Sequence, residues 1–211
     1  MHEKPQVENH AMVHSPNPSP KTTSPTEQPG VLRYFPLRTG YVWTYVEQVT
    51  TAAGSPLLQR QVTFTIHSRH GREYSAHWNF QSGHTRLPNV RYRAMPDGIQ
   101  HAQLTSDTAY TDFVYMLKAP LVVDTTWRGL QGYPVRISAV ALSCTVPAGM
   151  FERCVETVQE IEPTPENRVL TRRRFAPEIG LVWQQRRLFQ RTTLLRTDTM
   201  ELQKRPEPLR L

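Results

Sequence analysis

The chain is dominated by short runs in which apolar and polar residues alternate with a period of two, separated by residues that favour turns. The clearest run spans residues 60–69, where Val62, Phe64 and Ile66 alternate with polar side chains. Alternation of this kind indicates strands with one buried face. Because turn signals recur every 8–12 residues, we predict an all-β fold of about 10–12 strands, arranged as a single curved antiparallel sheet or incomplete β-barrel with little helix.

Composition excludes two other classes of protein. No apolar run approaches the ~18 residues that a membrane-spanning helix needs. The 18 prolines among 211 residues argue against a helical bundle, because proline interrupts helices. The net charge of +7 permits attraction to anionic surfaces but does not determine the fold.

The first 30 residues differ in composition from the rest. They carry six prolines among Ser, Thr, Asn and Gln, and no periodic apolar face. Burial there cannot offset the entropy of ordering the chain, so we predict a disordered, proline-rich tail over residues 1–30 and a barrel-like domain over 31–205. No apolar leader follows Met1. The sequence therefore leaves open a cytosolic protein or an exported one that lacks its leader.

Two segments are less regular. Residues 105–119 fit either a short helix or a loop followed by a strand. In residues 134–146 the apolar positions change parity near Ala139 and Val140, which predicts a β-bulge or a strand buried on both faces.

The two cysteines flank a tight turn at Pro147–Gly149. If Cys144 and Cys154 lay directly opposite each other in the hairpin, their Cα atoms would be close to disulfide distance. We therefore predict a disulfide between them. The alternative is a pair of buried free thiols in a reducing compartment.

Aromatic side chains mark the expected interior. In residues 41–45 three aromatic residues share one face of the strand. Three times, a proline and a turn residue precede a tryptophan that enters a strand. We expect the following side chains to line a concave core that could hold a ligand: Tyr41, Trp43, Tyr45, Phe64, Trp78 and Trp127.

Arginines are concentrated in the last three predicted strands. If those strands are neighbours, alternate arginines would form a basic face, with these members: Arg172, Arg174, Arg186, Arg187 and Arg191. Such a face could bind phosphate or nucleic acid. We interpret it instead as a solvated sheet face that keeps the protein soluble, and we expect no specific nucleic-acid binding.

The sequence contains no motif for nucleotide binding, hydrolysis or zinc coordination. His67 and His77 could meet across neighbouring strands, but convergent ligands are not evident, so we predict no metal and no cofactor. A dispersed catalytic triad needs no local motif and stays an alternative. We expect a protein that is not an enzyme.

Four motifs occur in an order typical of one group of proteins: Tyr34-Phe35-Pro36-Leu37-x2-Gly40-x2-Trp43-x-Tyr45, Leu117-Lys118-x-Pro120-Leu121-x5-Trp127, Val146-Pro147-Ala148-Gly149-x-Phe151-x2-Cys154 and Ala176-Pro177-x2-Gly180-Leu181-Val182. Over residues 31–203 the chain resembles uncharacterised bacterial envelope proteins, often lipoproteins, that are related in fold to LolA-like incomplete β-barrels. Asp124 departs from the glycine that is usual in that family.

The resemblance implies export to the periplasm or outer membrane, with the tail as a tether. Membrane attachment would then come only through a removed N-terminal lipid anchor. We expect a binding module for an apolar or lipid-like ligand or for an envelope protein. The alternative is an accessory subunit of an envelope assembly, which would contact partners through its tail or a sheet edge.

Overall fold

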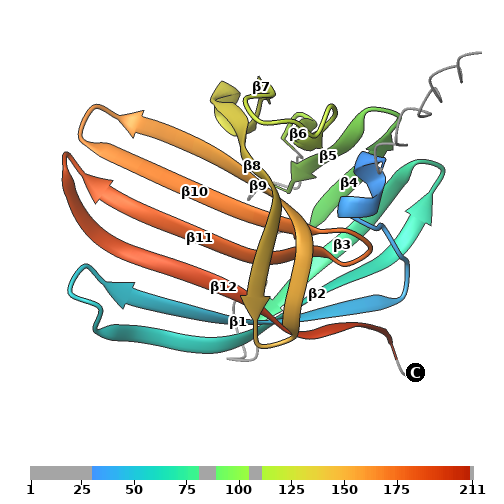
Figure 1. Ribbon diagram of the computed structural model, residues 1–211, viewed down its shortest axis with the longest axis horizontal. Helices are drawn as coiled ribbons and strands as arrows, with labels where there is room; N and C mark the ends of the chain where they lie inside the picture. The colour runs from blue at the N-terminus through green and yellow to red at the C-terminus, as the bar shows by residue number, and fades with distance from the viewer. Residues whose placement is uncertain (1–29, 81–88, 105–110, 210–211) are drawn as a thin grey trace, which may run out of the picture.

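All strands of the described chain belong to one antiparallel sheet (Figure 1). The computed structural model describes residues 30–80, 89–104 and 111–209. The strands are β1 (Tyr41–Thr51), β2 (Pro56–His70), β3 (Glu73–Phe80), β4 (Val90–Met95), β5 (Gly98–Gln103), β6 (Val114–Lys118), β7 (Thr126–Arg128), β8 (Pro134–Val146), β9 (Gly149–Thr164), β10 (Asn167–Ala176), β11 (Gly180–Gln190) and β12 (Thr193–Pro208). Two short 3₁₀ turns, η1 (Val31–Tyr34) and η2 (Leu130–Gly132), are the described helical elements. The predicted all-β class is confirmed.

The sheet is an almost closed barrel. Strands adjacent in sequence are paired, except β6 and β7, and β1 also pairs with β12. The barrel therefore has one seam, between the edge strands β6 and β7. Trp127 on β7 reaches across this seam, because its indole Nε1–H donates a hydrogen bond of 2.8 Å to the Tyr115 carbonyl on β6. A single indole thus joins two edges that no backbone ladder connects.

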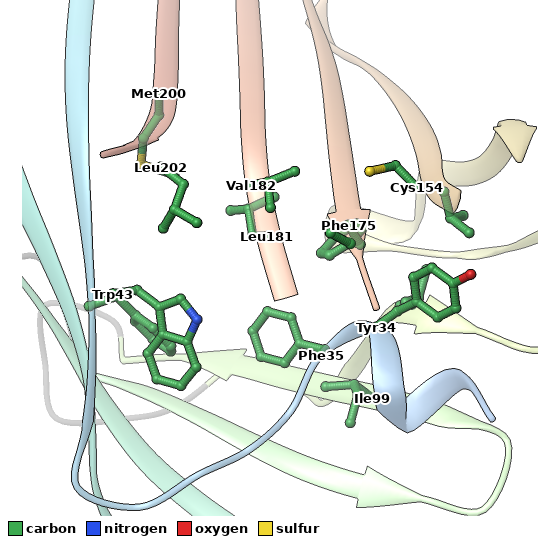
Figure 2. Packing of buried hydrophobic residues seen from close by; sticks show 14 of the residues in the cluster. Tyr34, Phe35, Trp43, Ile99, Cys154, Phe175, Leu181, Val182, Met200 and Leu202 are labelled. Atoms are coloured by element: carbon green, nitrogen blue, oxygen red, sulfur yellow. The ribbon is translucent and has the colours of Figure 1, made fainter. Parts of the chain in front are cut away.

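The segment that precedes β1 fills one end of the barrel. Tyr34 donates its hydroxyl to the Arg153 carbonyl at 3.0 Å, and Phe35 follows it into the interior. The Phe35 ring lies 5.1 Å from Tyr92 and 6.2 Å from Phe175, measured between ring centroids. Figure 2 shows Phe35 pointing inward among Trp43, Ile99 and Phe175. The aromatic side chains at this end form a solid core.

Two polar groups in this core are satisfied by one carbonyl in the turn before β11 and one at the start of β11. Trp43 donates its indole N–H to the Ile179 carbonyl at 2.7 Å. Tyr45, which is 2% exposed, donates its hydroxyl to the Leu181 carbonyl at 3.0 Å. Buried donors need such partners, so these bonds fix β1 against β11 across the interior.

The predicted bulge in residues 134–146 is confirmed. The pairing of β8 with β9 shifts three times, and Ala141 and Arg153 both have positive φ angles, of 55° and 56°. Each shift moves the partner strand by a residue relative to a regular ladder.

The predicted disulfide is not present, and this corrects the sequence-based expectation. Both cysteines are buried free thiols. Cys144 lies opposite Phe151, because the hairpin closes with Val146 opposite Gly149, and Cys154 lies opposite Leu142. The cysteines are therefore diagonal neighbours, typically about 7–8 Å apart, which is beyond the usual Cα separation of a disulfide. The Cys154 thiol donates a hydrogen bond of 3.5 Å to the Phe151 carbonyl. The neighbouring Cys154 lowers the pKa of the Cys144 thiol, as does Arg174 to a lesser extent, although burial opposes the shift.

Three further expectations concern chain segments. The predicted tail lies outside the described residues, apart from Gly30. Of residues 105–119, Val114–Lys118 form a strand, and 105–110 lie outside the described residues. At the other end, β12 continues to Pro208, past the predicted limit at 205, because its pairing with β1 extends to Tyr41.

Candidate ligand-binding cavity

A cavity of about 600 Å³ lies in the barrel interior beside the aromatic core. Side chains at alternate positions of the strands point into it, as the period of a strand requires. The lining contains apolar residues, namely Val62, Trp78, Phe80, Val90, Tyr92, Met116, Leu130, Ile161, Pro163, Val169, Leu181 and Met200. It also contains polar and charged residues, namely Glu47, Arg60, His101, Gln103, Gln131, Gln159, Thr171, Arg173, Gln184, Arg186, Arg196 and Asp198.

The inward-facing residues become more polar with distance from the core. On β2 the series runs from Phe64 in the core through Val62 to Arg60. On β12 it runs from Met200, which belongs to both the core and the cavity wall, to Asp198. Leu181 and Met200, both labelled in Figure 2, therefore lie at the boundary between core and cavity. The interior thus has a closed apolar end and a polar end that reaches solvent.

Two arginines of the lining form ion pairs with carboxylates of the lining. Arg60 on β2 donates a hydrogen bond to the carboxylate of Glu47 on the neighbouring strand β1. Arg196 pairs with Asp198 on the same strand, with 2.8 Å between nitrogen and oxygen. These pairs neutralise Glu47 and Asp198, which are the acidic residues of the lining within the described part of the chain.

Arg173 occupies a different position. It lies on β10 opposite Gln184 of β11, and its Nε donates a hydrogen bond of 2.9 Å to the Gln184 Oε1. Within the described part of the chain, no carboxylate lies at ion-pair distance from it. Its pKa is lowered to about 10, chiefly by burial and in part by nearby Arg186, while Tyr92 opposes the change.

His101 and Tyr92 complete this part of the wall. Their rings stack with centroids 6.4 Å apart. Burial and, to a smaller extent, the positive charge of Arg173 together lower the pKa of His101 from 6.5 to about 4, so the imidazole is neutral at pH 7. Burial also raises the pKa of Tyr92 far above its usual value. The Arg173 guanidinium therefore lies close to two rings, those of His101 and Tyr92, that are uncharged at pH 7.

The aromatic residues expected to line a ligand site are divided by the structure. Trp78 lines the cavity. Trp43, Tyr45 and Phe64 instead pack in the core around a void of only about 10 Å³. The other two lie elsewhere. Tyr41 is half-buried under the Arg38 guanidinium, and Trp127 spans the seam.

The arginines predicted to share a basic face are also divided. Arg186 lines the cavity. Arg172 and Arg187 are each one position along the strand from a cavity-lining arginine, Arg173 and Arg186 respectively, so they are exposed on the outer wall of the barrel. Arg174 pairs with Glu156 at 2.8 Å, and Arg191 pairs with Glu166 at 3.0 Å beside the turn after β11. The five side chains therefore do not form one continuous patch.

The predicted meeting of His67 and His77 does occur, with 3.2 Å between their Nδ1 atoms. Among residues 30–80, 89–104 and 111–209, no group of three or more His, Cys, Asp or Glu side chains is placed to hold a metal ion. Neither described helical turn is long and apolar enough to cross a membrane.

The seam gives little support to strand addition by a partner. Its edge strands are short, spanning Val114–Lys118 and Thr126–Arg128. The Tyr115 carbonyl on one edge is already used by Trp127. Short edges of this kind are a known protection against further pairing.

Sequence reasoning missed the polar half of the cavity, above all Arg173. The signal was present, because Arg173 has the same parity as Val169, Thr171 and Phe175, all of which are buried. An arginine on the buried face of a strand is unusual and indicates either a paired charge or a site.

Comparison with known proteins gives a fold but no family. No family model and no curated protein matches the sequence. Among solved structures, a Bacteroides fragilis protein described as exported and as having a YmcC-like fold superimposes with a TM-score of 0.51 at 14% identity, covering 81% of this chain and 97% of its own. A Parabacteroides distasonis protein described as a lipoprotein superimposes with a TM-score of 0.46 at 14% identity, with the same coverage. The first of these structures shows that the barrel architecture recurs, whereas the predicted relation to LolA-like proteins stays a prediction.

Proposed function

We propose that this chain is an exported protein of the bacterial cell envelope that binds a small amphipathic molecule inside its barrel and is not an enzyme. The observation that carries the proposal is the cavity of about 600 Å³, in which apolar walls and a few polar groups face the same space. The fold likeness to a protein described as exported supports the envelope location.

The cavity has the properties of a small-molecule site. Its volume falls within the range of roughly 300–1,000 Å³ that is typical of ligand pockets. The apolar residues supply the surface that a ligand would bury, and the polar residues would set its orientation. Exposed lining residues such as Arg186 and Arg196 place an entrance at the polar end. A ligand would therefore insert its apolar part toward Leu181 and Met200.

Binding can be tested by filling the cavity. Thr171 lines the cavity, and the adjacent Leu170 does not. We would titrate the neutral apolar probe N-phenyl-1-naphthylamine into the wild-type protein, Thr171→Trp and Leu170→Trp, and follow its fluorescence. We expect saturable binding to the wild type and to Leu170→Trp, and an affinity at least about tenfold lower for Thr171→Trp, since the indole would occupy the space. Failure of the wild type to bind the probe, or equal binding by all three proteins, would reject the cavity as a binding site.

The envelope location has its own test. Antibodies against the chain should detect it in the envelope or periplasmic fraction of the source bacterium. Recovery of the protein only with cytosolic markers would contradict export while leaving the binding result unaffected.

A further inference from the structure

The charges inside the cavity do not balance. The lining holds four arginines, Arg60, Arg173, Arg186 and Arg196, against the two carboxylates of Glu47 and Asp198. Both carboxylates are engaged by Arg60 and Arg196. Two positive charges, those of Arg173 and Arg186, therefore remain without an acidic partner among the lining residues that the structure describes.

These two arginines differ in their access to water. Arg186 is exposed, so solvent can stabilise its charge. Arg173 lies deeper, between Gln184 on the neighbouring strand and the rings of Tyr92 and His101. Its one hydrogen bond to a described residue uses Nε, so Nη1 and Nη2 have no acceptor among residues 30–80, 89–104 and 111–209. Arg173 is half-buried, so its charge is only partly hydrated, and a guanidinium with reduced hydration and no counter-charge is unfavourable.

The side chains around Arg173 cannot supply that counter-charge. Gln184 is neutral and already accepts from Nε. The depressed pKa of His101 and the raised pKa of Tyr92 keep both rings neutral at pH 7. A negatively charged group on a molecule that enters the cavity would supply the counter-charge that the described residues around Arg173 lack.

We propose that the ligand is an amphipathic anion, whose carboxylate or phosphate pairs with the two free nitrogens of Arg173 while its apolar part lies against Trp78, Leu181 and Met200. Guanidinium groups bind both kinds of acidic group through two parallel hydrogen bonds. This inference rests on the proposed function and adds the chemical class of the ligand to it.

The test compares ligands that differ only in the head group. Dodecanoate, dodecyl phosphate and dodecanol would each displace N-phenyl-1-naphthylamine from the wild-type protein below their micelle-forming concentrations. We expect at least one of the two acids to act at concentrations about tenfold lower than the alcohol, in keeping with a hydrogen-bonded ion pair. Comparing the acids with each other distinguishes a carboxylate from a phosphate ligand.

Variants then locate the effect. Arg173→Met should bring both acids to the potency of dodecanol, whereas Arg173→Lys should keep part of the preference because it keeps the charge. Arg187→Met, on the outer wall, should behave as the wild type. Circular dichroism would confirm that each variant is folded. The wild-type comparison of acid with alcohol needs no variant, so a misfolded Arg173→Met would not remove the test.

Two results would overturn the inference. One is equal potency of acids and alcohol on the wild type, and the other is an acid preference that survives in a folded Arg173→Met. In both cases the probe would still bind and the proposed cavity function would stand. Failure of the probe to bind would instead reject both.

Discussion

The depressed pKa of His101 predicts that acid weakens the fold. Protonation of this side chain is disfavoured in the folded state by burial and by Arg173, and its pKa falls from 6.5 to about 4. The unfolded chain therefore binds one more proton than the folded protein between these values. Stability rises with pH in this window, so it is fully present above pH 6.5 and is lost as the pH falls toward 4.

The size of the effect follows from the two pKa values. A shift from 6.5 to about 4 corresponds to at most about 3 kcal/mol at low pH. Because the loss is gradual, it amounts to about 2 kcal/mol between pH 7.5 and pH 5. This is a large part of the 5–15 kcal/mol that is typical for a domain.

The assay is urea denaturation at several pH values, followed by tryptophan fluorescence. His101→Gln removes the titrating group, so its unfolding free energy should change less between pH 7.5 and pH 5, by about 2 kcal/mol, than that of the wild type. His70→Gln alters an exposed histidine and is the matched control. Parallel curves for wild type and His101→Gln would refute the reasoning.

Three further predictions concern the fold. Phe175→Ala should lower the unfolding free energy by about 3–5 kcal/mol in denaturant titrations, because Phe175 is fully buried, and a loss below about 1 kcal/mol would contradict the packing. Trp127→Phe should cost about 1–2 kcal/mol and speed amide exchange in β6 and β7, since Tyr115 loses its cross-seam partner; unchanged exchange would assign closure of the seam to other contacts. Alkylation of unfolded protein without reductant should add two groups, at Cys144 and Cys154, as seen by mass spectrometry, whereas no addition would reveal a disulfide.

The elements of the fold could be predicted from local pattern. Strand positions follow from period-two alternation, as in Val62, Phe64 and Ile66, which are all buried. The parity change near Ala139 predicted the bulge that the structure contains. These features depend on residues that are neighbours in sequence, because the alternation of side chains along a strand and the extra residue of a bulge are both local properties of the chain.

The register of the hairpin between β8 and β9 was less predictable. Two cysteines allow only one intramolecular pairing, and a turn centred on Gly149 would place Cys144 opposite Cys154. The turn instead closes with Val146 opposite Gly149, which pairs Cys144 with Phe151 and leaves both cysteines as free thiols. The parity pattern indicates a bulge, but not the pair of residues at which the hairpin closes.

Local sequence pattern sets the strands, the turns and the placement of apolar side chains on one face of each strand. It could not decide where the interior is filled and where it is open. That depends on β1 closing against β12 and on Phe35 filling one end, contacts between residues far apart in the chain. Only these contacts place Arg173 in the wall of a cavity whose described lining offers it no acidic partner, because the balance of charge there is set by strands that meet only in three dimensions.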